Sequence, residues 1–333
     1  FALVMATGIV SLSAHFVEME FVARALFWLN HGLFALLSIL TLARLGLAPR
    51  RVIKDLTDHQ TGPAFLTLVA GTCVFGVQYV VQTDYGHSVG VVCWFAGLGL
   101  WVVLIYTFFT SITVRTAKPP LEKGLNGSWL LTVVSTQSLS ILGTLISPHF
   151  ERQDLILFFT LCLFLLGCML YLLIITLIFY RFSFFAMSAA ELSPPYWINM
   201  GAVAITTMAG ARLLLQSGDW LMLQEIRPFL KGFTLFYWVV ATWWIPLLLV
   251  LGDWRHIVQR VPFSYQPAYW SMVFPLGMYT GATFQLARAL DLSILLAIPA
   301  VAVYVAVAAW ALVFLFMVLN IGRWLLTRSE ELQ

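Results

Sequence analysis

Hydroxyl-bearing side chains recur at helical spacing within the apolar stretches of this chain. Thr7, Ser11 and His15 are spaced by four residues, and Thr136 and Ser140 repeat that spacing. Positions four apart share one face of a helix, and a polar group in mid-membrane is costly unless it faces protein or water. The chemistry that such a face offers is weak, uncharged coordination of an ion in a lumen, followed by easy release.

Similar narrow faces of small or polar residues occur in every second apolar stretch, and they define the candidate pore lining. The candidates are Thr7, Ser11, Gly71, Phe75, Thr136, Ser140, Thr207, Gly210, Gly277 and Gly281. Stripes of Gly, Ser and Thr are also the ordinary means by which membrane helices pack closely. For any single helix, close packing is the favoured interpretation. The alternation along the chain favours a pore, because packing alone gives no reason for it.

The elements that must position these faces are ten apolar stretches, each expected to cross a hydrocarbon core of about 30 Å. They cover residues 1–17, 24–45, 63–82, 88–111, 128–148, 153–180, 196–216, 229–252, 267–289 and 291–325. The odd-numbered stretches carry the polar faces, and the even-numbered ones are mostly Leu, Val, Phe, Trp and Ala. This pattern predicts an all-α membrane protein of five helical hairpins in a single transmembrane domain, residues 1–333. Odd helices would form an inner ring around a central pore, and even helices an outer ring.

Composition supports this fold class and excludes several others. Hydrophobic residues make up 61% of the chain, charged residues 10%, and the mean hydropathy is +0.92, values typical of an integral membrane protein. The net charge of +3 is small and spread over loops, so no nucleic-acid partner is expected. The four cysteines lie within apolar stretches without metal-ligand spacing, and no catalytic motif is present. We expect no metal, no cofactor and no enzymatic activity.

Basic residues set the expected orientation in the bilayer. Of the 18 Lys and Arg, 12 fall in one set of alternating loops and the C-terminal end, and 6 fall on the opposite side. The positive-inside rule places the richer side in the cytoplasm. We therefore expect a multi-pass protein of the cell inner membrane with both termini cytoplasmic.

Three basic side chains lie near the outer ends of odd-numbered helices: His15, Arg212 and Arg288. Together they would form a rim that attracts anions to an external vestibule. The alternative is that each side chain extends to the lipid headgroups. No Asp or Glu lies deep in any predicted span. Because proton-driven carriers usually need an ionisable relay within the membrane, this favours passive conduction.

The dipeptide Phe274–Pro275 is the sharpest local feature of the ninth stretch. Pro275 removes a backbone hydrogen bond and predicts a kink near the middle of that helix. The ring of Phe274 would then project into the lumen and close it by steric block and dewetting. An ordinary core phenylalanine is the alternative, since the chain has 26 of them.

Four segments resemble the tellurite-resistance/C4-dicarboxylate transporter family, in particular its prokaryotic branch. They are Phe1–Ser11 (FALVMATGIVS), Val69–Gly76, Trp129–Gly143 and Tyr269–Ala287, the last containing MVFPLG at Met272–Gly277. The family includes bacterial tellurite-resistance proteins, fungal malate permeases and sulfite pumps, and plant slow anion channels. The resemblance implies five hairpins around a pore, a homotrimer with one pore per subunit, and occlusion of the pore by a ninth-helix Phe. Phe274, four residues after Trp270, matches that position.

Two functions follow as expectations. The leading one is a channel or uniporter in the lipid bilayer that conducts small inorganic or organic anions through a pore gated by Phe274. The alternative is a proton-coupled carrier of malate or another C4-dicarboxylate, of sulfite or of another oxyanion, for which His15 is the available titratable group.

Overall fold

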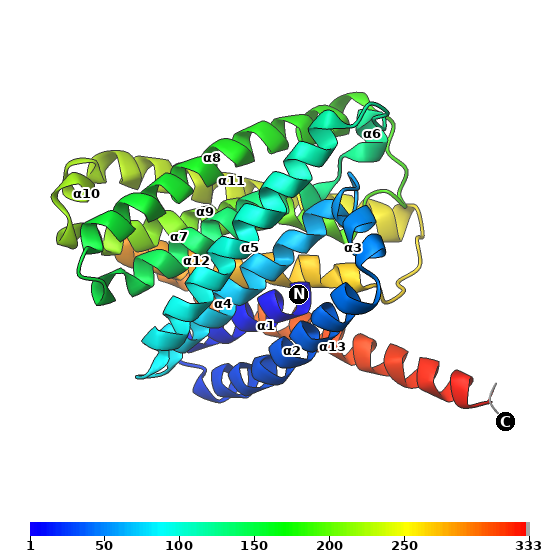
Figure 1. Cartoon of the computed structure of the whole chain (residues 1–333), viewed down its shortest axis with the longest axis horizontal. Helices are drawn as coiled ribbons and strands as arrows, with labels where there is room; N and C mark the ends of the chain where they lie inside the picture. Colours follow the sequence, from blue (N-terminus) through cyan, green and yellow to red (C-terminus); the bar gives the residue numbers. More distant parts are fainter. Residues whose placement is uncertain (331–333) are drawn as a thin grey trace.

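The computed structural model describes residues 1–330, which form helices and no strand. Ten helices have 15 residues or more and run roughly side by side (Figure 1). They are α1 (Ala2–Phe16), α2 (Glu20–Leu47), α4 (Thr67–Gln82), α5 (Gly86–Val114), α7 (Leu131–Ile146), α8 (Gln153–Phe184), α9 (Ile198–Leu215), α11 (Arg227–Asp253), α12 (Trp270–Leu290) and α13 (Ala297–Glu330). The predicted all-α fold class is confirmed.

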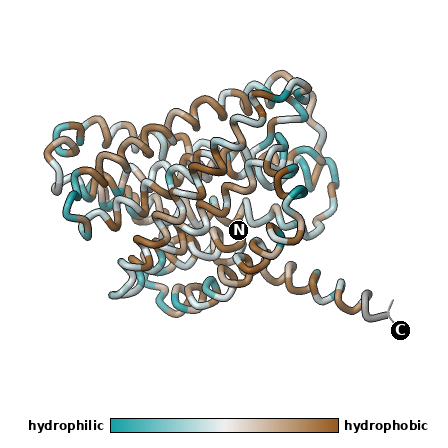
Figure 2. Tube along the Cα trace, in the orientation of Figure 1, coloured by the Kyte–Doolittle hydropathy of each residue, from teal (hydrophilic) through white to brown (hydrophobic). Residues whose placement is uncertain are grey.

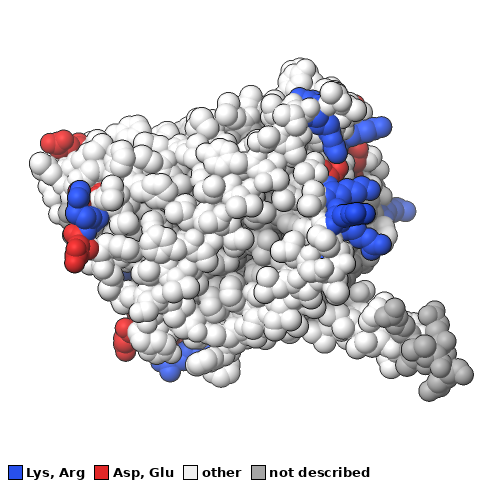
Figure 3. Space-filling view, in the orientation of Figure 1, with Lys and Arg blue, Asp and Glu red and all other residues white. Residues whose placement is uncertain are grey.

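Polar and apolar residues separate along the length of this bundle. Hydrophobic residues occupy the middle of the helices, and hydrophilic residues gather at the two ends (Figure 2). Charged side chains show the same division: Lys and Arg cluster at the end that carries the short helices α3 and α6 (Figure 3). Large apolar side chains in the middle band are exposed, for example Val103 at 62% and Leu173 at 58%. An apolar belt of this kind is stable only against lipid, so the bundle is a membrane protein.

The helices form two concentric rings. Helices α1, α4, α7, α9 and α12 each contact the next, and α12 returns to contact α1. Around them, α2 packs on α1, α5 on α4, α8 on α7, α11 on α9 and α13 on α12. Each hairpin therefore contributes its first helix to the inner ring and its second to the outer ring, as the alternation in sequence predicts.

Burial follows the same division. In the most apolar stretch of the α7 segment 94% of the residues are buried, and in that of the α9 segment 89%, whereas in the α2 and α13 segments the share is only 17%. Inner helices can tolerate hydroxyls because protein surrounds them, whereas outer helices meet lipid and must be apolar. This is the physical reason for the alternation.

Eight of the described helical segments are long and apolar enough to span a membrane. Two inner helices are not among them. Helix α1 has 15 residues, or about 22 Å at 1.5 Å per residue, which is less than a full hydrocarbon core. Helix α12 has 21 residues but is less apolar. The ten-span topology, with residues 1–17 and 267–289 as two of its spans, therefore stays a prediction.

Prolines begin several inner helices, as expected from their missing amide hydrogen. Pro63 is the second residue of the 3₁₀ turn before α4, and Pro194 and Pro195 begin the turn before α9. Sequence reasoning missed most of the short elements in the loops and a π-helical turn that continues α11. The short helices are α3 (Pro49–Leu56), η1 (Gly62–Leu66), α6 (Leu121–Gly124), η2 (Gly127–Leu130), η3 (Ser147–His149), η4 (Pro194–Trp197), η5 (Ser217–Asp219), α10 (Leu221–Glu225), the π-helical η6 (Trp254–Val258), η7 (Pro267–Tyr269) and η8 (Ser293–Leu296).

Candidate functional site

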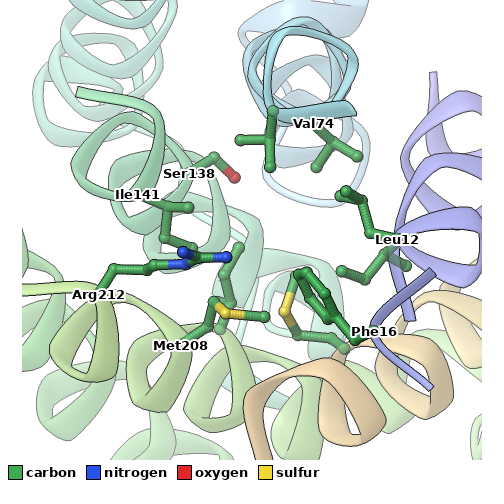
Figure 4. Close-up of a pocket in the computed structure, with 11 residues that line it drawn as sticks. Leu12, Phe16, Val74, Ser138, Ile141, Met208 and Arg212 are labelled. Carbon is green, nitrogen blue, oxygen red and sulfur yellow. The ribbon is translucent and has the colours of Figure 1, made fainter. Parts of the chain in front are cut away.

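A narrow cavity lies between the helices of the inner ring (Figure 4). All five inner helices contribute to its wall: Ile9, Leu12 and Phe16 from α1, Val74 and Val77 from α4, Ser138 and Ile141 from α7, Ile205, Met208 and Arg212 from α9, and Met278 from α12. Its volume is about 20 Å³, roughly the space that one water molecule needs. We call this space the axial cavity.

The wall of the axial cavity is apolar except for Ser138 and Arg212. Arg212 is near the end of α9, and its guanidinium extends between the inner helices (Figure 4). Its Cζ atom lies 5.8 Å from the centre of the Phe16 ring, within range of a cation–π interaction. Its Nε is buried and has no hydrogen-bond partner among the described residues. A cation with no carboxylate partner in an apolar chamber favours an anion there and disfavours a cation.

Phe274 lies on α12 one helical turn before Met278 and is completely buried. Residues four apart share a helix face, so Phe274 is on the side of α12 that faces the axial cavity. On either side of this face, Gly277 approaches α1, where an added Cβ would lie 3.0 Å from Ile9 Cγ2, and Pro275 packs against Gly201 of α9. Helix α12 continues through Pro275 without interruption. These contacts hold the Phe274 segment between α1 and α9, but Phe274 itself is not among the residues that line the axial cavity.

Three of the predicted pore-lining hydroxyls, those of Thr7, Thr136 and Ser140, bond to helices of the outer ring. Trp310 of α13 donates from Nε1 to the Thr7 hydroxyl (2.9 Å), and Trp101 of α5 donates likewise to Thr136 (2.9 Å). The Ser140 hydroxyl donates to the carbonyl of Thr160 on α8 (2.8 Å). These contacts lie at the interface between the rings, and none of these hydroxyls lines the axial cavity.

Ser11 and Thr207 are engaged in the same way or within their own helix. The Ser11 hydroxyl donates to the carbonyl of Ala23 on α2 (2.8 Å), and that of Thr207 donates to Val203 one turn back (2.9 Å). Both residues are fully buried. Their polar groups are satisfied by protein rather than turned to the cavity.

Of the other predicted lining residues, most also serve helix contacts. Phe75 stacks on Phe34 of α2 with ring centres 4.3 Å apart. A Cβ at Gly210 would lie 2.2 Å from Thr234 Oγ1 on α11, and one at Gly71 would lie 3.2 Å from Phe1. These glycines allow close approach of neighbouring segments.

Gly277 and Gly281 are the predicted lining residues that remain within the inner ring. Gly277 meets α1, as described above. A Cβ at Gly281 would lie 3.1 Å from Met208 Cε and 3.6 Å from the Phe16 ring, and both of those side chains line the axial cavity. Gly281 thus borders the cavity wall.

The three predicted rim residues occupy different environments. Arg212 lines the axial cavity, Arg288 is exposed at the end of α12, and the two guanidinium groups are close enough to repel each other. His15 instead pairs with Glu20, because its Nδ1 lies 2.9 Å from the Glu20 carboxylate. Arg24 Nε lies 3.6 Å from the same carboxylate. The structure brings Arg212 and Arg288 together and leaves His15 in a separate surface cluster.

Sequence reasoning missed the apolar residues that form most of the cavity wall. Ile9, Leu12 and Phe16 share one face of α1, whereas Thr7 is two residues, or about 200°, from Ile9. An apolar stripe of this kind is typical of any buried helix, so no sequence signal marks it as a cavity wall. No group of three or more His, Cys, Asp or Glu that could hold a metal occurs in the described part of the chain.

Two rings of helices in an apolar belt, with an inner cavity that carries one partly buried cation, define an integral membrane transport protein. The sequence profile of the voltage-dependent anion channel family, SLAC1, matches residues 1–318, nearly the entire chain. The chain belongs to this family, and the resemblance found in its sequence segments is confirmed.

Relatives in distant organisms agree with this assignment. A protein of Mycobacterium tuberculosis with the name uncharacterized membrane protein Rv1735c is 36% identical over 148 residues, which cover 44% of this chain and 75% of the relative. The uncharacterized transporter MJ0576 of Methanocaldococcus jannaschii is 26% identical over 309 residues, covering 89% and 84%. The uncharacterized transporter MJ0762 of the same organism is 24% identical over 294 residues, covering 85% and 82%. Family and relatives together support transport of anions across a membrane.

Proposed function

We propose that the protein is a passive anion channel or uniporter of the cell inner membrane, with a conduction path along the axis of the inner ring. The observation that carries this proposal is Arg212, a guanidinium without a carboxylate partner inside the axial cavity. Its charge lowers the cost of dehydrating an anion at that depth and raises the cost for a cation. Arg288, exposed beside it, adds to the positive potential at the entrance.

In this proposal the described structure is a closed state, with Phe274 as the gate. Complete burial of the Phe274 ring and the small volume of the adjoining cavity support this role. The apolar wall contributes too, because a narrow apolar passage excludes water and ions until it widens. Ions that dehydrate easily, such as large monovalent anions, would pass most readily.

The alternative is a proton-coupled carrier of a C4-dicarboxylate, sulfite or another oxyanion. Such a carrier needs a group that takes up and releases protons along the path. The described lining of the axial cavity contains no Asp, Glu or His, and His15 pairs with Glu20 outside it. These observations favour passive conduction.

Anion flux into liposomes, with and without a pH gradient, tests the proposal. We expect chloride, nitrate, malate, sulfite and tellurite to differ in rate, and the flux to follow the membrane potential without needing a proton gradient. Protein-free liposomes are the control. Uptake that requires a proton gradient and saturates with substrate would contradict the channel proposal and support the carrier.

We also propose a homotrimer with one pore per subunit, as the family resemblance implies. The axial cavity is lined by residues of a single chain, so conduction itself does not require a neighbour. Mass measurement in native lipid discs tests this assembly, and a monomer that conducts would overturn the trimer while leaving the pore assignment intact.

A further inference from the structure

A second pocket lies away from the axis, at the end of the bundle where α11 ends and α9 and α12 begin. Its volume is about 150 Å³. Leu192, Ser193 and Trp197 form one side, and Arg255, Phe263 and Tyr269 form the other. Arg255 belongs to the π-helical turn that continues α11, an irregularity often found at functional sites. We call this space the lower pocket.

Arg255 in the lower pocket is a buried cation with an unused hydrogen-bonding edge. The side chain is 8% exposed, and its Nη1 donates to the carbonyl of Leu192. Its Nε is buried without a partner, and no described carboxylate forms an ion pair with this guanidinium. With Nη1 occupied, the remaining Nε–Nη2 edge carries two parallel N–H groups, the geometry that binds two oxygens of one oxyanion.

A nearby arginine shows that Arg255 lacks what a structural arginine usually has. Arg181 is 5% exposed and donates from Nη1 to the Leu125 carbonyl and the Tyr196 hydroxyl. Its Nη2 also lies 3.9 Å from the Glu191 carboxylate. Both arginines fix the loop between α8 and α9, but only Arg181 has a negative charge beside it.

The other walls of the lower pocket suit an anion that carries an organic group. The imidazole of His256 donates from Nδ1 to the Val261 carbonyl (2.9 Å) and stacks on Phe263 with ring centres 3.8 Å apart. This fixes the ring in the wall and leaves Nε2 without a described partner. Aromatic and aliphatic side chains form the rest of the surface.

We propose that the lower pocket binds a phosphate-type oxyanion, either a free phosphate or the phosphate of an anionic lipid headgroup. The Nε–Nη2 edge of Arg255 binds two of its oxygens, and the Ser193 hydroxyl is placed to donate to a third. An anion there compensates the buried charge, which otherwise has no counter-ion among the described residues.

This site is distinct from the conduction path. Met272 lines the lower pocket, whereas Phe274 lies on the face of α12 toward the axial cavity. Two residues along a helix are separated by about 200°, so the pocket is behind the gate helix. An anion in the lower pocket contacts the end of α11 and the starts of α9 and α12. Through these contacts it regulates the gate on α12, and this regulatory role rests on the proposed function.

Binding is tested with the full chain in phosphatidylcholine nanodiscs, by thermal unfolding in inorganic phosphate against chloride at equal ionic strength. At ten times Kd we expect phosphate to raise Tm by about 2 °C. A second arm replaces free phosphate by phosphatidylglycerol in the disc. A shift only with free phosphate identifies a soluble ligand, and a shift only with phosphatidylglycerol identifies a lipid.

Two variants and one control make the test specific. Arg255→Gln removes the fork, and Gly252→Leu fills the pocket while leaving the bond from Arg255 to Leu192 intact; a Cβ at Gly252 meets no atom within 4 Å. Arg260→Gln removes an exposed charge from the same loop. We expect both pocket variants to lose the shift and the control to keep it. If Arg255→Gln does not fold, Gly252→Leu decides.

The proposal is overturned if neither arm shows a shift, or if Gly252→Leu keeps the full shift. Anion flux measured on the same preparations separates the two proposals. We expect ligand to change the flux at least twofold in wild type and not in Gly252→Leu. Binding without any change in flux would support the binding site but contradict its regulatory role. Binding by a protein that conducts no anion would contradict only the proposed function.

Discussion

The wall of the axial cavity and the interface between the two rings use opposite chemistry. At the interface, buried hydroxyls of the inner helices meet indole N–H groups and carbonyls of the outer helices, as in Thr7 with Trp310 and Thr136 with Trp101. In the cavity wall, aliphatic side chains and Phe16 surround one guanidinium, that of Arg212. The hydroxyls of the inner ring therefore lie mostly behind the wall of the axial cavity and not in it.

This difference has a physical basis. Lipid tails are as apolar as leucine, so no hydrophobic gain holds membrane helices together, and packing and interhelical hydrogen bonds do so instead. A stripe of Thr, Ser and Gly thus marks the side on which a helix has a partner. In the proposed channel, the apolar path closes by excluding water, and the charge of Arg212 favours anions once the path opens.

The largest effect should come from the cavity side, at Phe274. We expect Phe274→Ala to raise anion flux in planar bilayers by roughly tenfold or more, because the substitution removes the ring that blocks the path. A tenfold rise corresponds to a barrier lowered by about 1.4 kcal/mol. Phe314→Ala, on the outer helix α13, is the matched control and should leave the flux unchanged. Wild-type current from a folded Phe274→Ala protein would remove the gate from this position.

Arg212 and Arg288, in the last turns of α9 and α12, should differ in how their effects on conductance depend on salt. We expect Arg212→Gln to lower conductance by about fivefold, equivalent to about 1 kcal/mol of lost attraction for the ion. Since Arg212 is partly buried in the cavity wall, salt screens it less than an exposed charge, and most of the loss should persist at about 1 M salt, where the Debye length is about 3 Å. Arg288→Gln, an exposed site, should lower conductance only at low salt. Identical salt profiles for both variants would contradict the placement of Arg212 inside the cavity.

The sequence predicts the rings well and the lumen-facing surfaces poorly. Alternation of polar and apolar helices is sufficient for the ring arrangement, because lipid rejects hydroxyls from the outer helices. The alternation does not show which face of an inner helix is turned to the axis, because a hydroxyl such as that of Thr7 suits a bond to a neighbouring helix as well as the lining of a pore. The apolar wall face of Ile9 and Leu12 resembles any buried stripe. The sequence does single out Arg212, because a charged residue near the end of an apolar span is unusual. The structure places Arg212 in the wall of the axial cavity and not only at the predicted rim.

Alanine substitutions at Gly210, between the two rings, and at Gly281, beside the cavity wall, test how tightly each region is packed. At Gly210 an added Cβ would meet three atoms of Thr234 at 2.2–3.1 Å, and rotating that β-branched side chain cannot clear all of them. We expect Gly210→Ala to destabilise the protein by about 1–2 kcal/mol, since overpacking of about 1–3 kcal/mol exceeds the helix-propensity gain. A Cβ at Gly281 would lie 3.1 Å from both the mobile end of Met208 and the Ser13 hydroxyl. Because these contacts need only small shifts, we expect Gly281→Ala to change stability by less than about 1 kcal/mol. Thermal unfolding in detergent measures both, and the reverse order would contradict the assigned packing.

The smallest effect should come from the interface, at Thr7. Thr7→Val keeps the shape of the side chain but leaves the Trp310 indole N–H without its acceptor. Interhelical hydrogen bonds in membranes average about 0.6 kcal/mol, with a maximum of about 1.7, so we expect a loss in that range. Trp310→Phe should cost a similar amount, and the double variant should cost less than the sum, because both changes remove the same bond. Anion flux and selectivity should stay within twofold of wild type in all three. A changed selectivity in Thr7→Val, at unchanged stability, would instead place this hydroxyl in the lumen and return the polar stripe of α1 to the conduction path.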